Sequence, residues 1–295
     1  MIHTPVMLDE VIEYLNIKPG AKIIDATLDG GGHSAAILER TGFTGKVLGI
    51  EIDPELILAA KLKIKNEKLK NLVVENDNYT NLKKIVTEYG FYPDGILFDL
   101  GVSFWHYEKS GRGFSFMRDE LLDMRFNTKI ETKTAADIVN TASREELEDI
   151  LASYGEEKFA SEISKNIVNF RKIKPVVKTS ELAEIINNSV PGWYRHKKIN
   201  PATKTFQALR IAVNDELDNV ARGINAAVDV VNSGGRIVVI SFHGLEDKIV
   251  REVFKRKAKE GIIRWVVKGT VKPKWEETKN NPRARSAKMK IVEKV

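Results

Sequence analysis

The segment DATLDGGGHS, residues 25–34, places two acids, three consecutive glycines, a histidine and a serine directly after an apolar run. A strand followed by a glycine loop and a helix start is how an α/β sheet builds a nucleotide site. Asp25 and Asp29 make this loop a poor host for a pyrophosphate, because all these groups carry negative charge. The residues therefore favour a nucleotide ligand that also carries positive charge.

S-Adenosylmethionine meets this requirement, and two other nucleotide motifs are missing. The dinucleotide register G-x-G-x-x-G is absent, and no lysine follows the glycines as a phosphate-binding P-loop requires. The carboxylate of S-adenosylmethionine suits the N–H groups of a loop and a helix start, while its ammonium and sulfonium suit nearby acids. Gly31, Gly32 and the backbone of His33 are expected to let the ligand approach closely.

Two further acids end apolar runs. Glu51 lies about 20 residues beyond the loop, where an acid can accept hydrogen bonds from both ribose hydroxyls. Asp99 follows the run DGILF, and at the carboxyl end of a strand it would face both cofactor and substrate. The alternatives are an ordinary strand-end acid at Glu51 and a turn acid at Asp99.

These residues need a sheet to position them, and short apolar runs alternating with helical patterns predict one that is parallel and doubly wound, of the α/β class. The expected strands cover residues 22–28, 46–53, 71–77, 94–103 and 236–242, with closing strands at 263–269 and 287–295. This pattern matches the class I S-adenosylmethionine-dependent methyltransferase sheet, a Rossmann-like fold, although other doubly wound folds are compatible with it.

Residues 105–200 contain no convincing strand, so a helical insertion is expected. We predict a methyltransferase domain formed by 1–108 and 201–295, and a helical insertion over 109–200 that recognises the substrate. Apolar residues at steps of three and four across 206–231 predict an amphipathic helix, with room for one break.

Helix starts can be read from local signals. Ser143 and Glu146 form a capping-box sequence, and Thr179 or Ser180 is expected to cap another helix. Pro54 suits the first turn of a helix that follows the second strand.

The 295 residues include no cysteine, which excludes a disulfide framework, a thiolate zinc site and a cysteine nucleophile. No signal peptide and no membrane-spanning run is visible, so a cytoplasmic protein is expected. The net charge of +6 is unevenly spread: residues 251–295 hold 15 lysines and arginines against 5 acids, and residues 168–210 hold 9 against 2. Two basic segments on an otherwise acidic chain favour a polyanion partner, the alternative being solvated lysine-rich faces.

Several ordered blocks, beginning at His3-Thr4-Pro5-Val6, carry a resemblance to a known family. They are DLGVS (99–103), RGFSF (112–116), LDMRF (122–126), YGEEKFA (154–160), PATKTFQALRIAVNDEL (201–217), GGRIVVISFHGLED (234–247) and NPRARSAKMK (281–290). The chain resembles the bacterial MraW/RsmH family, which methylates the exocyclic N4 amine of a cytidine in small-subunit (16S) ribosomal RNA with S-adenosylmethionine as the donor.

The resemblance implies a set of cofactor-binding residues. They are Gly31, Gly32, His33, Glu51, Tyr79, Asp99 and His106. Tyr79 matches an aromatic residue that lines the adenine. Two positions depart from the family pattern: His106 stands where glutamine is usual, and Asp29 stands where glycine is usual, which adds charge beside the ligand.

The implied reaction is direct methyl transfer to an amine whose lone pair is delocalised into the cytosine ring. We expect Asp99 and the carbonyls of Leu100 and Gly101 to accept the N–H hydrogens of that amine, while positioning supplies most of the acceleration. No metal-ligand spacing is visible, and no metal is expected.

Ribosomal RNA, free or within the 30S particle, is the implied partner, and the insertion offers surface for a homodimer contact. Arginines inside the family blocks are expected to hold phosphates, the alternative for each being a salt bridge: Arg112, Arg125, Arg210, Arg283 and Arg285. Trp105, Phe114 and Phe116 are expected either to stack on the flipped base or to pack in the core. The segments 193–198 and 272–285 interleave aromatic and basic residues, as RNA-binding surfaces do.

Three other functions are compatible with the sequence. The chain could be an RNA-binding relative without chemistry, which the departures at Asp29 and His106 support. It could methylate a protein or a small molecule, which the basic segments disfavour. A nicotinamide oxidoreductase is disfavoured by the missing glycine register.

Overall fold

The computed structural model describes residues 5–67 and 69–295, so His3 and Thr4 of the resemblance lie outside the described residues. The chain divides into two compact units. The sheet unit contains residues up to Gly101 together with Leu217–Val295, and the helical unit contains Val102–Glu216. Each unit encloses hydrophobic cores of its own. No helix in the described part of the chain is both long and apolar enough to cross a membrane.

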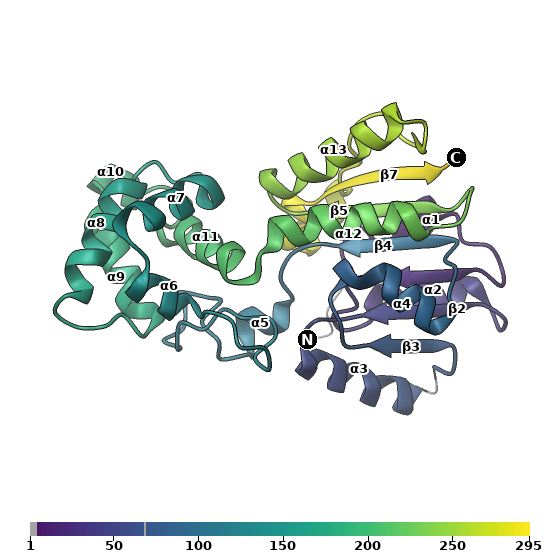
Figure 1. The fold of residues 1–295 in the computed structure, drawn as a ribbon, viewed down its shortest axis with the longest axis horizontal. Helices are drawn as coiled ribbons and strands as arrows, with labels where there is room; N and C mark the ends of the chain where they lie inside the picture. The colour runs from purple at the N-terminus through teal and green to yellow at the C-terminus, as the bar shows by residue number, and fades with distance from the viewer. Residues whose placement is uncertain (1–4, 68) are drawn as a thin grey trace. The chain divides into compact units, whose positions relative to one another are not determined.

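The sheet unit is built on seven strands in the order β3-β2-β1-β4-β5-β7-β6. Strands β2, β3, β4, β5 and β7 are labelled in Figure 1. The seven strands are β1 (Lys22–Asp25), β2 (Lys46–Ile50), β3 (Leu72–Glu75), β4 (Gly95–Asp99), β5 (Arg236–Ser241), β6 (Ile263–Trp265) and β7 (Lys288–Lys294). The first five are parallel, whereas β7 runs antiparallel to both β5 and β6. This is the class I S-adenosylmethionine-dependent methyltransferase fold, and all seven predicted strands are confirmed.

Successive strand residues enter different cores, because neighbouring side chains in a strand point to opposite faces. Ile24 packs with Ile96 and Phe98 in one core, whereas Ile23 packs with Leu97 in the other. Helices α4, α12 and α13 contribute to the first core, and α1, α2 and α3 to the second. A sheet with helices on both faces explains why its strands are almost continuously apolar.

The helices of the sheet unit follow the predicted pattern. They are α1 (Leu8–Leu15), α2 (Gly32–Thr41), α3 (Pro54–Glu67), α4 (Leu82–Tyr89), α12 (Glu216–Val230), α13 (Gly244–Lys259) and α14 (Trp275–Asn280), with the 3-10 turns η1 (Tyr79–Asn81) and η2 (Pro282–Ser286). Pro54 occupies the first position of α3, as expected.

The helical unit contains seven helices within its described residues. They are α5 (Phe104–Glu108), α6 (Ala135–Thr141), α7 (Arg144–Gly155), α8 (Ala160–Arg171), α9 (Thr179–Ser189), α10 (Gly192–Arg195) and α11 (Ala202–Asn214). The predicted capping box is confirmed: Ser143 Oγ accepts from the backbone N–H of Glu146 at 3.1 Å, and the Glu146 carboxylate accepts from the backbone N–H of Ser143 at 2.7 Å.

The predicted cap of α9 is wrong. Thr179 is the first residue of this helix, and Lys178 precedes it as the N-cap. The Thr179 hydroxyl instead accepts from the backbone N–H of Glu120 at 3.0 Å and donates to the carbonyl of Arg118. A tertiary contact with residues about sixty positions earlier has taken the hydroxyl that the local sequence offers to the helix.

The helical unit is longer than the expected insertion of 109–200 at both ends. The amphipathic pattern over 206–231 divides into α11 and α12 at Asp215, whose φ is +49°. Helix α11 then packs on α7 and shares the core of the helical unit through Phe206 and Leu209. A periodic apolar face shows that a helix is buried but not which core buries it.

Candidate active site

The glycine loop joins β1 to α2, and its three glycines meet different steric demands. Gly31 has a φ of +68°, in the left-handed region that L side chains rarely adopt. A Cβ on Gly32 would lie 2.5 Å from Cγ of Pro5, whereas a Cβ on Gly30 would meet no atom within 4 Å. The loop is therefore fixed by its backbone at Gly31, packed at Gly32 and open at Gly30.

Asp29 keeps the left-handed backbone that a glycine would supply there, with a φ of +45°. Its backbone N–H donates to Oε2 of Glu51 at 2.9 Å, and the N–H of Asp53 donates to Oε1 at 2.9 Å. Burial, with the nearby charges of Asp29 and Asp53, raises the pKa of Glu51 to about 8. Two backbone bonds thus hold this carboxyl group at the end of β2.

Asp99 ends β4 and is held from the loop after β1. Its backbone N–H donates to Oγ1 of Thr27 at 2.7 Å, and its Oδ2 lies 3.7 Å from Nδ1 of His33. Within residues 5–67 and 69–295, the buried Oδ1 atom has no hydrogen-bond partner. Burial raises the pKa of Asp99 well above its usual range, and the charges of Asp25 and Asp29 add to the effect.

Asp25 completes a cluster of acids at the carboxyl ends of β1, β2 and β4. Its Oδ2 accepts from the Ser34 hydroxyl at 2.7 Å, and burial raises its pKa to about 6. In the described part of the chain, no lysine or arginine forms an ion pair with Asp25, Glu51 or Asp99. Buried carboxyls without cations stay partly protonated until a positive group arrives.

Thr27 and Ser34 position these acids, although neither is predicted from the sequence to be a functional residue. Both are short hydroxyl residues within DATLDGGGHS, and Ser34 lies close in sequence to Asp25, whose carboxylate it contacts. That proximity was the available signal. The partner of Thr27, however, is the backbone of Asp99, which is 72 positions away.

Tyr79 lies in η1 with its ring edge against Phe98, at a centroid distance of 5.5 Å. A Cβ on Gly223 of α12 would lie 2.4 Å from Cδ2 of Tyr79. The half-buried ring therefore packs on the core of the sheet unit beside the carboxyl end of β3. This is the strand edge at which the acids gather.

The sequence of the whole chain, residues 1–295, matches the model of the MraW methylase family. The chain belongs to the MraW methylase family. Three relatives named ribosomal RNA small subunit methyltransferase H are similar along nearly their full length. The protein of Dictyoglomus thermophilum is 47% identical, with 99% of this chain and 97% of the relative covered. Those of Dehalococcoides mccartyi and Clostridioides difficile are 43% and 38% identical, with 99% of this chain and 86% and 99% of the relatives covered.

The methylase family and the class I fold make S-adenosylmethionine the cofactor, and the acid cluster fits it. A ligand with an ammonium and a sulfonium supplies the cationic partner that Asp25 and Asp99 do not have among the lysines and arginines of the described part of the chain. Its hydroxyls can donate to Glu51, and Oδ1 of Asp99 still has capacity to accept.

His106 belongs to the helical unit, whereas the other predicted cofactor residues belong to the sheet unit. Its buried ring contacts Phe114 and Phe126, with centroid distances of 4.9 and 5.0 Å. In this methylase the residue that replaces the usual glutamine therefore packs in an aromatic cluster. Its role toward the cofactor stays a prediction.

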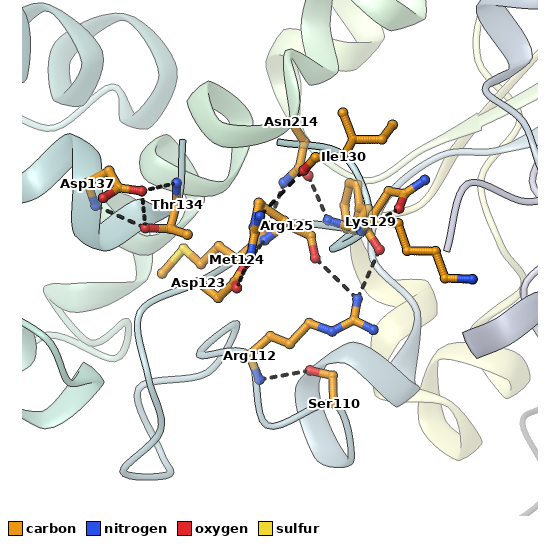
Figure 2. A network of polar contacts seen from close by, with 12 residues as sticks. Ser110, Arg112, Asp123, Met124, Arg125, Lys129, Ile130, Thr134, Asp137 and Asn214 are labelled. Atoms are coloured by element: carbon orange, nitrogen blue, oxygen red, sulfur yellow. Dashed lines mark hydrogen bonds and ion pairs between the residues drawn. The ribbon is translucent and has the colours of Figure 1, made fainter. Parts of the chain in front are cut away.

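Two of the arginines predicted to hold phosphate have internal partners in the helical unit (Figure 2). Nη1 of buried Arg112 donates to the carbonyls of Arg125 and Phe126, at 3.2 and 2.9 Å. Arg125 makes a two-pronged ion pair with Asp123, at 2.8 and 2.7 Å. These contacts join the RGFSF and LDMRF blocks of the family.

The other three arginines differ in exposure. Arg210 is nearly buried and pairs with Glu216 through two bonds of 2.7 and 2.9 Å. Arg283 and Arg285, in η2 of the sheet unit, are exposed. The salt-bridge alternative is thus confirmed for Arg125 and Arg210, and the exposed pair is better placed to meet a polyanion.

The aromatic residues expected near the target base are engaged within the helical unit. Phe114 is buried and stacks on Phe126 with an angle of 13° between the rings. Phe116 contacts Phe206 edge-on. Trp105 is half-buried, with the Arg112 guanidinium 5.1 Å from its ring. Core packing accounts for Phe114, and base stacking stays a prediction for the other two.

Proposed function

We propose that this methylase transfers a methyl group from S-adenosylmethionine to the exocyclic N4 amine of a cytidine in small-subunit (16S) ribosomal RNA. The observation that carries the proposal is Asp99: a half-buried acid at the carboxyl end of β4 with one buried oxygen that has no hydrogen-bond partner in the described part of the chain. An amine substrate brings the N–H donors that such an oxygen needs. The names of the relatives support the RNA substrate.

The cofactor would be held by the edge formed from β1, β2 and β4. The start of α2 at Gly32 and His33 suits the carboxylate of the ligand, because a helix N-terminus carries partial positive charge. Glu51 would accept from the ribose hydroxyls, and Tyr79 would line the adenine. When bound, S-adenosylmethionine supplies an electrophilic methyl group whose departure leaves a neutral thioether.

Asp99 then acts on the amine. Its ionised carboxylate accepts an N–H hydrogen of N4 and directs nitrogen lone-pair density toward the methyl carbon. As the N–C bond forms, N4 becomes positively charged, and Asp99 takes the proton that N4 must lose. A raised pKa suits this step, because it makes the Asp99 carboxylate a stronger base than an ordinary carboxylate.

Two exposed basic surfaces support an RNA partner. In the helical unit, Trp193 is 61% exposed and Nζ of Lys197 lies 4.9 Å from its ring centre. In the sheet unit, Arg283 and Arg285 lie exposed on η2. Aromatic rings beside cations bind bases and phosphates together. We further propose a cytoplasmic location and substrate recognition by the helical unit; the homodimer stays a prediction.

Methyl incorporation tests the proposal. Small ribosomal subunits that lack the modification would be incubated with the protein and radiolabelled S-adenosylmethionine, before and after digestion with ribonuclease. The proposal predicts that the label is in the RNA, so that digestion with ribonuclease releases it. Label in ribosomal protein, or none although calorimetry detects cofactor binding, would contradict it.

A further inference from the structure

A basic cavity of about 440 Å³ lies in the sheet unit, outside the acid cluster. It is lined from the end of β5, the start of α13, the segment after β6, and the stretch from α14 to the start of β7. None of its lining residues is acidic, while Lys272, Arg285 and Lys288 line it. Residues 272–288 thus bring three cations to one hollow, whose other wall is formed by the end of β5 and the start of α13.

These cations are incompletely neutralised by the protein. Within residues 5–67 and 69–295, Lys272 forms no ion pair, and Arg285 uses Nε on the carbonyl of Thr278 at 3.3 Å. Nζ of Lys288 lies 3.6 Å from Oδ2 of Asp247. The other oxygen of this carboxylate, Oδ1, lies 2.9 Å from Nζ of Lys290. Lys272 and Arg285 are exposed. Such a group of cations with no acid among the lining residues attracts an anion.

The cavity belongs to the same edge of the sheet as Asp99. Strands β4 and β5 are paired with Asp99 opposite Ile240, two residues before the lining residue Phe242. A Cβ on Gly101 would lie 3.1 Å from Cδ2 of Phe242, so the chain just after Asp99 packs against the wall of the cavity. The cavity and the acid cluster therefore flank the carboxyl end of β4.

We propose that this cavity binds a backbone phosphodiester of the RNA substrate, next to the nucleotide whose base is methylated. The inference rests on the proposed function and adds a second contact at the same edge. S-Adenosylmethionine has no phosphate, so the cavity has no task in binding the cofactor. The guanidinium of Arg285 offers planar, two-pronged donors to phosphate oxygens, and Lys272 and Lys288 add point charges. Because Lys272 and Arg285 are exposed, an RNA chain bound there can continue past the cavity in both directions.

The test compares two double variants with the same loss of charge. Lys272→Gln with Arg285→Gln removes two cations of the cavity; Lys255→Gln with Arg251→Gln removes an exposed lysine and arginine of α13 that do not line it. Binding of a fluorescent small-subunit RNA fragment is measured by anisotropy at several salt concentrations. Cofactor binding is measured by calorimetry and folding by thermal melting, and both should match the wild type in all variants, since the changed residues are exposed.

The cavity variant should weaken RNA binding about tenfold or more and lower the slope of log K against log salt by roughly 1 to 2, because each lost phosphate contact removes close to one released counterion. The α13 variant should change both much less. Replacing Arg285→Gln by Arg285→Lys in the cavity variant should restore part of the lost RNA affinity, because lysine keeps the charge.

Equal RNA affinity and slope in the wild type and the cavity variant would overturn the inference, as would equal losses in both double variants. Tight calorimetric binding of inorganic phosphate, lost in the cavity variant while RNA binding is unchanged, would assign the cavity to a free anion and overturn it too. A wild-type protein that neither binds nor methylates the RNA would contradict the proposed function itself, and with it this inference.

Discussion

Nδ1 of His33 lies 3.7 Å from Oδ2 of Asp99, while Nε2 of the same ring lies 3.0 Å from the carbonyl oxygen of Val6. A carbonyl only accepts, so the neutral ring carries its proton on Nε2 and turns the Nδ1 lone pair toward Asp99. At 3.7 Å the imidazole and the carboxyl group interact electrostatically, without a direct hydrogen bond. This arrangement places a titratable ring beside the acid that we propose takes the proton of the substrate amine.

The Asp99→Asn variant should lose most of its catalytic rate and keep its cofactor affinity within a few fold. An amide can still accept through its oxygen but cannot take the proton, a loss of about 10²–10⁴-fold for a positioned base. Single-turnover methylation with saturating S-adenosylmethionine measures the rate. The Asp94→Asn variant, at the other end of β4, is the matched control and should keep the wild-type rate. A full rate in Asp99→Asn would remove Asp99 from the mechanism.

The preference for S-adenosylmethionine over S-adenosylhomocysteine should rise as the pH increases from about 6 to about 8. The pKa values of Asp25, about 6, and Glu51, about 8, lie above the ordinary values of these groups, so both carboxyls are neutral below this window and ionised above it. Ionised carboxylates attract the substrate form of the cofactor, which carries one more positive charge than the product.

Calorimetric titration of both ligands across this pH range measures the preference. The Glu51→Gln variant should flatten its dependence on pH, whereas Glu55→Gln, which changes an exposed acid of α3, should not. A preference that is constant with pH in the wild type would show that the acid cluster does not sense the charge of the ligand.

Gly32→Ala should destabilise the protein by about 1–3 kcal/mol, because the new methyl group would lie 2.5 Å from Cγ of Pro5. The Pro5→Ala change removes that ring. A double-mutant cycle in urea should therefore show that Gly32→Ala costs clearly less in the Pro5→Ala background. Equal costs in both backgrounds would mean that the glycine is needed for some reason other than this contact.

Gly223→Ala should weaken cofactor binding, although Gly223 lies on α12, outside the glycine loop. Its methyl group would displace the Tyr79 ring from Phe98, and loss of a stacked base is typically worth about 1–3 kcal/mol. Calorimetry should show this loss in the wild-type background and a smaller one in Tyr79→Ala. If Tyr79→Ala by itself leaves the affinity unchanged, the ring serves packing only.

Arg210→Ala should lower the free energy of unfolding by about 3–5 kcal/mol, because it leaves the nearly buried Glu216 carboxylate without its partner. Arg222→Ala is the control: it breaks an exposed pair with Asp218 and should cost less than about 1 kcal/mol. Urea unfolding measures both. A small loss in Arg210→Ala would favour the original prediction that this guanidinium is available for phosphate.

Local patterns were sufficient to predict the sheet and several helix starts. Strands such as β4 and β5 are buried on both faces, so their apolar runs are continuous, and the Ser143–Glu146 capping box needs residues only three positions apart. The acids of the site could be predicted because parallel strands bring their carboxyl ends to one edge.

The contacts that tertiary structure supplies could not be predicted in this way. Nothing near Gly32 in the sequence indicates the ring of Pro5, and nothing near Arg112 indicates the carbonyls that it meets. The sequence does not distinguish an arginine that binds a phosphate from one that hydrogen-bonds to a neighbouring loop of the protein. The assignment of α11 to the helical unit likewise depended on which helix it packs against.

The position of the new methyl group tests most directly whether the amine is the site of transfer. Small subunits lacking the modification would be methylated with deuterated S-adenosylmethionine, and the RNA digested to nucleosides that are separated against standards methylated at N4, C5, N3 and the 2′-oxygen of cytidine. We expect the label in N4-methylcytidine from a single site. Label at C5 or the 2′-oxygen would contradict it, because Asp99 would then not face an amine.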